Sequence, residues 1–330
     1  MAKLPVTIAT GDYDRVRPIV DGRVAVEGCE VAYFPIPIEE TSYRTFTNAE
    51  FDVAEVSLSS FVLARSRGAI PYIGLPVFTS RMFRHSAVYV RADSGIESPG
   101  DLKGREVGVP VYAMTAALWV RGMLAEEYGV RPSDIVWRTG GLEQPGRYGA
   151  YPLDLPPGIE VRPLPPERSL SAMLAAGELP ALVSARAPSC FGAGGGPVRR
   201  LFPDYRAAEE AYYRKTGLYP IMHLVAMRES LAEAHPWLPA SLYKAFRAAK
   251  NIAVAALDDV TAPHVSVPWI AAEVERTRAL LGRDIWPYGF QDNLRELEAV
   301  VRYSHAQGLA VRELDPAELF HPSTRESARV

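Results

Sequence analysis

The hydrophobic residues of this chain follow two alternating spacings. Short apolar runs such as VTIAT (6–10), FDVAEVS (51–57) and IPYIGLPVF (70–78) are typical of strands. Between them lie segments expected to be helical, near residues 38–48 and in SLSSFVLARSRG (57–68), and the C-terminal segments such as DNLRELEAVVRYSHAQG (292–308) have apolar residues three and four apart, as in an amphipathic helix. A mainly parallel sheet with crossover helices produces this alternation. The pattern therefore predicts an α/β fold.

The alternation also predicts two lobes. A second set of strands and helices begins at SPGDLKGREVGVP (98–110), and PIMHLVAMR (220–228) is then expected to return as a strand to the first set. Beyond that strand the spacing is helical throughout. We expect residues 1–92 with 220–330 to form one lobe and residues 93–219 an inserted second lobe. Two crossings of this kind make a hinge, and a ligand cleft is expected between the lobes.

Composition narrows the choice of partners. The chain has 330 residues, 48% hydrophobic and 23% charged, which suits a globular protein of two domains. A net charge of -3 argues against nucleic acid as a partner. The absence of a signal peptide and of a long apolar run predicts a cytoplasmic protein that does not bind membranes. Two distant cysteines, Cys29 and Cys190, predict neither a disulfide framework nor a metal site. The amphipathic C-terminal helices leave a homo-oligomer possible.

Motifs along the chain resemble those of one known family. SPGDLKGREVGVP resembles the start of the second lobe in type II periplasmic-binding-protein folds, and ATGDYDR and FDVAEVSLSSF resemble their first-lobe ligand loops. Together with PVFTSRMFRHSAVYV, RAPSCF, YPIMH and WPYG, they make the chain similar to the 4,5-dihydroxyphthalate decarboxylases, from about residue 7 to about residue 309. The resemblance implies a two-lobed type II periplasmic-binding-protein-like fold that works as an intracellular enzyme.

The activity that the resemblance implies is decarboxylation of an aromatic (hydroxy)dicarboxylic acid, such as 4,5-dihydroxyphthalate to protocatechuate and CO₂. Each carboxylate of this compound is para to a hydroxyl, so a deprotonated hydroxyl pushes electrons toward the ring carbon that takes up the proton. Loss of CO₂ then restores the aromatic ring. Because no separate electron sink is needed, we expect a carboxy-lyase without a cofactor.

One segment, VPVYAMTAALW, departs from the family pattern. The family usually has an acidic residue at the position of Val111 and a longer polar residue at that of Ala113, whereas Tyr112, Met114 and Thr115 match. The departure leaves the exact acid open. A substrate that lacks a hydroxyl or carries an apolar substituent is the alternative.

Candidate catalytic residues lie at the two expected crossings. Arg84 and His85 adjoin in FRHS at the first crossing, and His223 lies in YPIMH at the second. Arginine matches a carboxylate with a planar fork of donors, and histidine exchanges protons near neutral pH. We expect Arg84 to hold the anion and His85 and His223 to share proton transfer. The alternatives are a surface ion pair for Arg84 and hydrogen-bonded structural roles for the two histidines.

Candidate binding residues follow the first strand and begin two helices. Asp12, Tyr13 and Arg15 come after the strand at 6–10, where open α/β sheets place ligands, although Asp12 could simply cap a helix. Helix starts bind anions through free backbone N–H groups and hydroxyls, or the hydroxyls serve as caps alone. The candidates at the two helix starts are Ser57 and Ser59 in the first lobe and Tyr112 and Thr115 in the second.

The second lobe also offers an arginine for a diacid. Arg186, in SARAPS, is a candidate second carboxylate clamp, with a surface ion pair as the alternative. Tyr112 could equally pack on Trp119, which makes Thr115 the better candidate of that pair.

Two other functions fit the same fold. One is a non-catalytic small-anion binding protein or sensor, which would bind a ring acid tightly without turnover. The other is a cofactor-free enzyme of the menaquinone pathway, chorismate dehydratase or dihydroxynaphthoate synthase, whose motifs match this chain less well.

Overall fold

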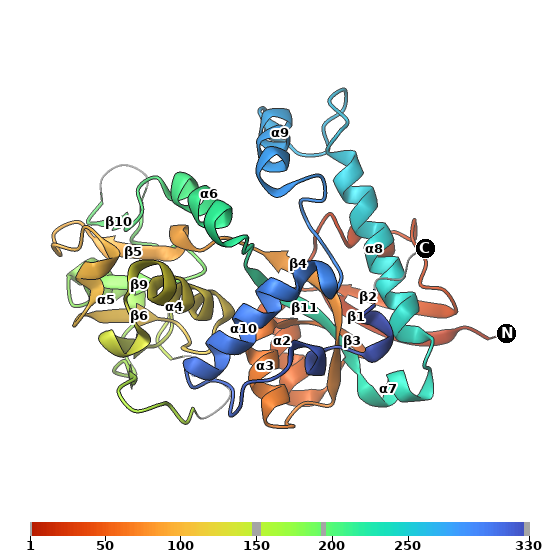
Figure 1. Ribbon diagram of the computed structural model, residues 1–330, viewed down its shortest axis with the longest axis horizontal. Coiled ribbons are helices and arrows are strands. Elements are labelled where there is room, and N and C mark those ends of the chain that lie inside the picture. The colour runs from red at the N-terminus through yellow and green to blue at the C-terminus, as the bar shows by residue number, and fades with distance from the viewer. Residues whose placement is uncertain (1, 147–152, 193–195, 327–330) are drawn as a thin grey trace.

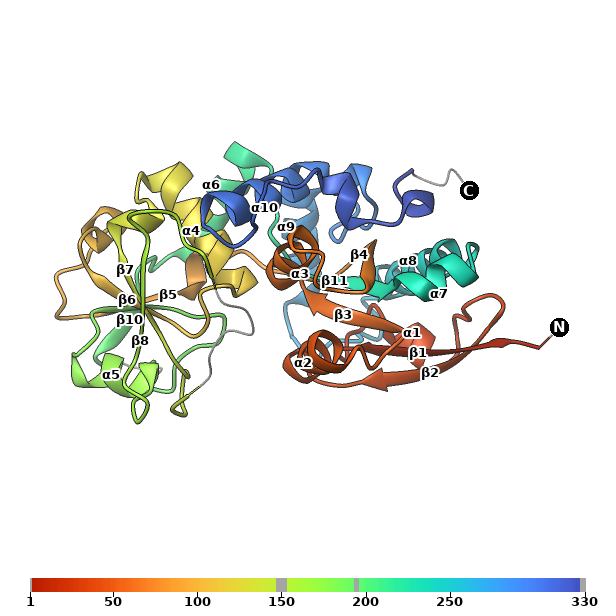
Figure 2. The same ribbon diagram turned by 90° about the horizontal axis from the view of Figure 1, so that it is seen from below.

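The chain forms two sheets that lie at opposite ends of the molecule (Figures 1 and 2). In the computed structural model, residues 2–146, 153–192 and 196–326 are described. The first sheet has five strands in the order β2-β1-β3-β11-β4, and the second has six in the order β10-β5-β9-β6-β7-β8. The predicted two-lobed α/β arrangement is therefore present.

The first sheet combines four strands from the N-terminal part of the chain with β11, which follows the second lobe in sequence. β1 pairs in parallel with β2 and β3, whereas β11 runs antiparallel between β3 and β4. Its strands are β1 (Leu4–Thr10), β2 (Cys29–Pro35), β3 (Val53–Ser57), β4 (Tyr72–Arg81) and β11 (Ile221–Arg228). The helices that alternate with them are α1 (Arg17–Val20), α2 (Ile38–Asn48) and α3 (Leu58–Ser66). The predicted return strand is thus confirmed, and it brings residues near 223 beside those near 57.

The second sheet contains a parallel core. β9, β6, β7 and β8 are parallel neighbours, and β5 pairs antiparallel with β9 and β10. Its strands are β5 (Val88–Arg91), β6 (Glu106–Val109), β7 (Val136–Thr139), β8 (Glu160–Pro163), β9 (Ala181–Val183) and β10 (Val198–Arg200). Its helices are α4 (Thr115–Tyr128), α5 (Leu170–Ala176) and α6 (Tyr205–Thr216). Gly129, with φ of 64°, ends α4 in the left-handed conformation that glycine favours.

The chain passes between the sheets at two segments. One runs from the end of β4 through the short 3-10 helix η1 (His85–Ala87) into β5, and the other joins α6 to β11. The expected boundary at residue 92 assigned β5 to the first lobe. Because β5 hydrogen-bonds within the second sheet, the change of sheet comes before Val88.

The C-terminal region is helical and connects the two lobes. α10 packs on α3 of the first lobe and on α4 of the second (Figure 2). The fully buried Arg121 of α4 donates from Nε to Gln307 Oε1 at 2.6 Å, just beyond the end of α10. The helices of this region are α7 (Glu229–Ala234), α8 (Leu238–Ala256), α9 (Ile270–Leu281) and α10 (Leu294–Ala306).

Single-turn 3-10 helices complete the structure: η2 (Pro99–Leu102), η3 (Pro132–Asp134), η4 (Gln291–Asn293), η5 (Pro316–Leu319) and η6 (Pro322–Thr324). The turn of η2 follows Ser98, whose backbone N–H and hydroxyl both donate to Asp101. No helix within the described ranges has the length and apolar character needed to cross a membrane.

Candidate active site

A cavity of about 380 Å³ lies between the two lobes. Its walls come from α2 and the β3–α3 junction of the first lobe, from the segments that follow β6 and β9 in the second, and from both crossings. Three charged or titratable side chains line it from the first lobe and the crossings: Glu39, Arg84 and His223. Ile38, Val111, Met114, Leu142 and Met222 give the same cavity an apolar side.

His223 is held by a buried carboxylate. In the register of the sheet His223 lies opposite Ser57, and Val225 lies opposite Glu55, so the three polar side chains share one face. Glu55 is fully buried, and its Oε1 lies 2.8 Å from Nδ1 of His223. A carboxylate on one ring nitrogen fixes the orientation of the imidazole. The other nitrogen, Nε2, is then the one available to the cavity.

Glu55 is held in turn by the end of the first strand. The backbone N–H of Gly11 donates to its Oε2 at 2.7 Å, and the hydroxyl of Tyr13 donates to its Oε1 at 2.9 Å. Burial by itself would raise the pKa of Glu55. The hydrogen bonds and charge of His223, with the donors from Gly11 and Tyr13, outweigh burial and hold that pKa below its ordinary value. Glu55 is therefore an anion inside the lobe.

Arg84 is a partly buried cation at the wall of the cavity. Its Nε donates to Sδ of Met222 at 3.2 Å, and burial lowers the pKa of the guanidinium to about 10. Within the described part of the chain, no carboxylate forms an ion pair with it. An arginine desolvated in this way gains strongly from an incoming carboxylate, which can take two parallel hydrogen bonds from its fork.

Two helices start at the cavity and touch each other there. Ser57 precedes the first residue of α3, and Thr115 is the first residue of α4. Their hydroxyl oxygens lie 2.8 Å apart, and the backbone N–H of Ser59 donates to Thr115 Oγ1 at 3.0 Å. Ser57, Ser60 and Thr115 line the cavity, whereas the buried Ser59 side chain does not. The positive ends of both helices therefore face the site.

An ion pair spans the two lobes beside the same cavity. Arg186 Nη2 lies 2.6 Å from Glu39 Oε1, and both residues line the cavity. The side chains are 72% and 40% exposed, so the pair is open to solvent. Exposed pairs of this kind contribute little to stability and exchange partners readily. The surface ion pair considered for Arg186 is thus present, at a position where a ligand could replace Glu39.

His85 does not reach the cavity, which corrects the expectation that both histidines face it. The residue is 1% exposed, and its ring lies against Tyr128, Phe202 and Tyr212 with centroids 6.2, 5.0 and 5.4 Å away. Burial lowers the pKa of His85 to about 4. The turn of η1 points it into the core of the second lobe, while its neighbour Arg84 faces the cavity.

Three residues that follow the first strand also lie outside the cavity lining. Asp12 is exposed and pairs with Arg17, so it neither caps α1 nor faces the site. Tyr13 acts on Glu55. Arg15 lies between the rings of Tyr13 and Trp286 and donates from Nε to the carbonyl of Thr79 at 2.7 Å. That carbonyl belongs to an irregular stretch of β4, where the register with β11 shifts.

Tyr112 is likewise a core residue. It is 2% exposed, with the Arg121 guanidinium 3.8 Å from its ring centre and Trp137 against its edge. The ring packs on Trp137 instead of the Trp119 considered from the sequence. Of the two positions that depart from the family pattern, Val111 lines the cavity and the partly buried Ala113 packs against the core.

Glu55 and Glu39 are functional candidates that were not predicted from the sequence. A signal for Glu55 was present, because it is the one acidic residue in the apolar run VAEVS, and a buried carboxylate requires partners. Its partner His223 lies 168 positions away, so no local pattern could pair them. Glu39 has no distinctive signal, since acidic residues are common in the first turn of a helix. Within the described residues, no group of three or more His, Cys, Asp or Glu could hold a metal ion.

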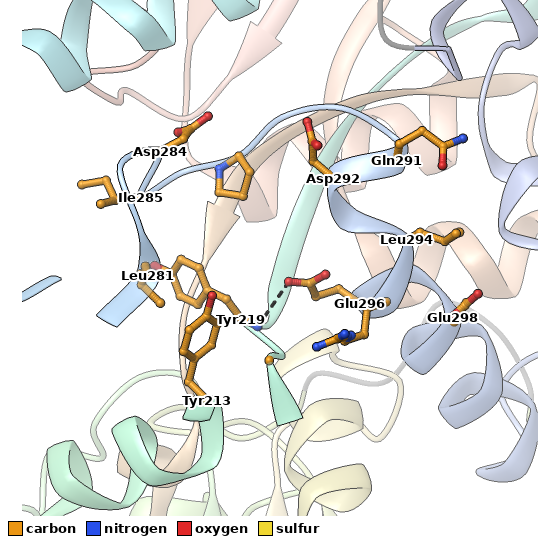
Figure 3. A pocket seen from close by; sticks show the side chains of 13 residues that line it. Tyr213, Tyr219, Leu281, Asp284, Ile285, Gln291, Asp292, Leu294, Glu296 and Glu298 are labelled. Atoms are coloured by element: carbon orange, nitrogen blue, oxygen red, sulfur yellow. Dashed lines mark hydrogen bonds between the residues drawn. The ribbon is translucent and has the colours of Figure 1, made fainter. Parts of the chain in front are cut away.

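A second cavity, of about 450 Å³, is lined by residues of α6, of the segment before α10 and of α10 itself (Figure 3). Asp284, Asp292, Glu296 and Glu298 line it with Arg295 as the single cation, and the N–H of Tyr219 donates to Glu296 at 3.3 Å. This excess of negative charge disfavours a dicarboxylate. None of the described residues that line it is a histidine.

Comparison with known proteins identifies relatives over the whole chain. A family model described as "ABC transporter, phosphonate, periplasmic substrate-binding protein" matches residues 22–143. The chain is 46% identical over 330 residues, the full length of both, to a 4,5-dihydroxyphthalate decarboxylase from Comamonas testosteroni. It is 45% identical over 214 residues to a 4,5-dihydroxyphthalate decarboxylase from Pseudomonas putida, covering 65% of this chain and 83% of that protein.

The fold has solved counterparts. The periplasmic aliphatic sulphonate-binding protein SsuA from Escherichia coli matches with a TM-score of 0.54 and 13% identity, and the match covers 97% of each chain. At this identity the similarity concerns the fold alone. It confirms the two-lobed periplasmic-binding-protein-like fold expected from the sequence.

Proposed function

The chain belongs to the 4,5-dihydroxyphthalate decarboxylase family, and on this premise we propose that it decarboxylates 4,5-dihydroxyphthalate in the cavity between its lobes. In this proposal the protein is a carboxy-lyase, and its partner is a small aromatic carboxylate. His223 supplies the proton that replaces the carboxylate, and Arg84 binds the substrate. The observation that carries the assignment is the hydrogen bond to Glu55 that orients His223 in the cavity, where Arg84 also lies and has no carboxylate partner among the described residues.

The reaction can be followed proton by proton. The hydroxyl para to the departing carboxylate gives up its proton, and the ring electrons move toward the carbon that carries that carboxylate. Nε2 of His223 protonates this carbon, which leaves a dienone with a carboxylate on a tetrahedral carbon. The bond to the carboxylate then breaks, CO₂ departs, and the electron pair restores the ring as a phenolate. The phenolate and His223 each regain a proton, and the product is 3,4-dihydroxybenzoate.

Binding uses the two cations that line the cavity, Arg84 and Arg186. Arg84 takes one carboxylate because its guanidinium is partly buried and has no carboxylate partner among the described residues. Arg186 exchanges Glu39 for the other carboxylate at the exposed side. The helix starts at Ser57 and Thr115 add hydroxyl and N–H donors, and the apolar side that includes Val111 and Met114 receives the ring face.

The test is incubation of the purified protein with 4,5-dihydroxyphthalate in D₂O, with CO₂ and ring product followed together. The proposal predicts equal amounts of CO₂ and 3,4-dihydroxybenzoate, with one deuterium at ring position 6, the carbon that lost the carboxylate. Phthalate, which lacks both hydroxyls, should bind without releasing CO₂. Tight binding of 4,5-dihydroxyphthalate without CO₂ release would overturn the proposal in favour of a binding protein.

A further inference from the structure

Glu55 has a geometry that a merely structural acid would not need. It is completely buried, yet both of its oxygens accept hydrogen bonds, and one of its three partners is the only histidine among the described residues that line the cavity. Burying a carboxylate is unfavourable unless it is fully hydrogen-bonded or paired. Two of its partners come from the segment that follows β1 and the third from β11.

We propose that Glu55 is the positioning residue of the reaction: it keeps the Nδ1–H of His223 directed into the lobe and stabilises the imidazolium that gives its Nε2 proton to the substrate ring. This inference rests on the proposed function for its chemistry. Glu55 touches neither substrate nor reacting atoms and acts only through His223.

The electrostatics follow from the arrangement of donors. While His223 is an imidazolium, Glu55 lies 2.8 Å from its charge in a buried setting, where an opposite charge is screened little by water. The N–H of Gly11 and the hydroxyl of Tyr13 keep Glu55 ionised and prevent it from taking the proton of His223 itself. After His223 has given up the Nε2 proton, its Nδ1–H still donates to Glu55, so the ring does not turn. Nε2 is then ready to be protonated again.

The decisive substitution is Glu55→Gln, which keeps the shape and removes the charge. The backbone N–H of Gly11 must still meet an oxygen, so the amide NH₂ is left facing His223. The amide NH₂ donates to His223 and so favours the neutral tautomer that has no proton on Nδ1. The imidazolium form of His223 also loses the negative charge that stabilised it. We expect kcat to fall about a hundredfold or more and KM to change little. The decline of kcat at alkaline pH should move by about one pH unit or more to lower pH, because the imidazolium is easier to deprotonate.

A matched control is Glu296→Gln. Glu296 is also a largely buried acid that faces an arginine, Arg81, at 3.7 Å, but it lies outside the cavity of the proposed site. This variant should lose stability while its alkaline limb stays where it is in the wild type. A Glu55→Gln enzyme with the kcat and pH profile of the wild type would overturn the inference.

A second measurement does not depend on the folding of a variant or on turnover. Nitrogen-15 shifts of the wild-type histidine rings, with His223 assigned through its loss in His223→Gln, report which nitrogen carries the proton. We expect an imidazolium or a neutral ring protonated at Nδ1, and a neutral ring protonated at Nε2 would overturn the inference. If the wild type releases no CO₂ from 4,5-dihydroxyphthalate, the proposed function fails on its own, and this spectrum still decides the role of Glu55.

Discussion

The hydroxyl oxygens of Ser57 and Thr115 lie 2.8 Å apart and join the two lobes at the cavity. Each belongs to the start of a helix, one in each lobe, and the Thr115 oxygen also accepts the backbone N–H of Ser59. The site is thereby assembled from both lobes at a point where two helix dipoles converge. An anion held there would contact both lobes at once.

Removing the Thr115 hydroxyl should weaken this contact between the lobes, and ligand binding should be weakened but not abolished. Thr115→Val keeps the volume but leaves Ser57 and the N–H of Ser59 without their partner. We expect binding of 3,4-dihydroxybenzoate to weaken about tenfold, the equivalent of about 1.4 kcal/mol. Calorimetric titration measures it, with Thr41→Val, a buried threonine of α2 outside the cavity lining, as the control. Equal affinities in all three proteins would contradict the assignment of Thr115.

Arg84→Met should separate function from stability. Among the described residues, the partly buried guanidinium has the sulfur of Met222 as its one hydrogen-bond partner, so an apolar side chain of similar length removes an unfavourable desolvation. We expect equal or greater resistance to urea, and a fall in kcat/KM of about ten- to a hundredfold, because one charged hydrogen-bonded contact is lost. Urea titration and steady-state kinetics on the same sample provide the check. Unchanged kcat/KM would remove Arg84 from the site.

Glu39 and Arg186 are predicted to have opposite effects on substrate binding. Glu39→Gln frees Arg186 from its ion pair, so KM for 4,5-dihydroxyphthalate should fall by a few-fold. Arg186→Gln should raise that KM, while the affinity for benzoate, which has one carboxylate, changes less. Initial rates and competition by benzoate distinguish these cases. A rise in KM in both variants would show that the ion pair itself, and not the free arginine, supports binding.

His85 should make the fold sensitive to acid without contributing to catalysis. Its pKa of about 4 in the folded protein lies below the ordinary 6.5, so the unfolded chain binds a proton more readily. Above pH 6.5 His85 is neutral in both the folded and the unfolded protein and costs no stability. As the pH drops from 6.5 toward 4, protonation of His85 in the unfolded chain lowers the free energy of unfolding by up to about 3 kcal/mol.

The test is His85→Leu, compared with the wild type by urea unfolding at pH 7.5 and pH 5. The variant should lose less stability than the wild type between the two pH values and should keep kcat within a few-fold at pH 7.5. Loss of turnover in a folded variant would restore His85 as a catalytic candidate.

Much of the fold could be predicted because local signals are strong in it. Helix 38–48, the junction at Ser57 and the Gly129 cap depend on spacing and on residues close in the chain. The strands β8 and β10 have only four and three residues and were missed. Helix α6 was missed because Tyr212 is its one buried residue, so no apolar stripe marks it in the sequence. The cytoplasmic location and the possible homo-oligomer stay predictions.

The site was predictable only in part, for reasons of direction and distance. Both crossings could be located, but sequence does not tell which way a side chain leaves a single turn such as η1. In the structure Arg84 faces the cavity, whereas its neighbour His85 faces the aromatic core of the second lobe. The contact of Glu55 with His223 depends on the pairing of β3 with β11, which only the folded sheet establishes.

The most direct test of the central claim is a single-turnover measurement of CO₂ release from 4,5-dihydroxyphthalate by the wild type and by His223→Gln. The account predicts that the wild type releases one CO₂ per site. The variant should bind 3,4-dihydroxybenzoate within about tenfold of the wild type but release CO₂ about a hundred- to ten-thousandfold more slowly. Equal rates of CO₂ release in the two proteins would contradict the role of His223 as proton donor.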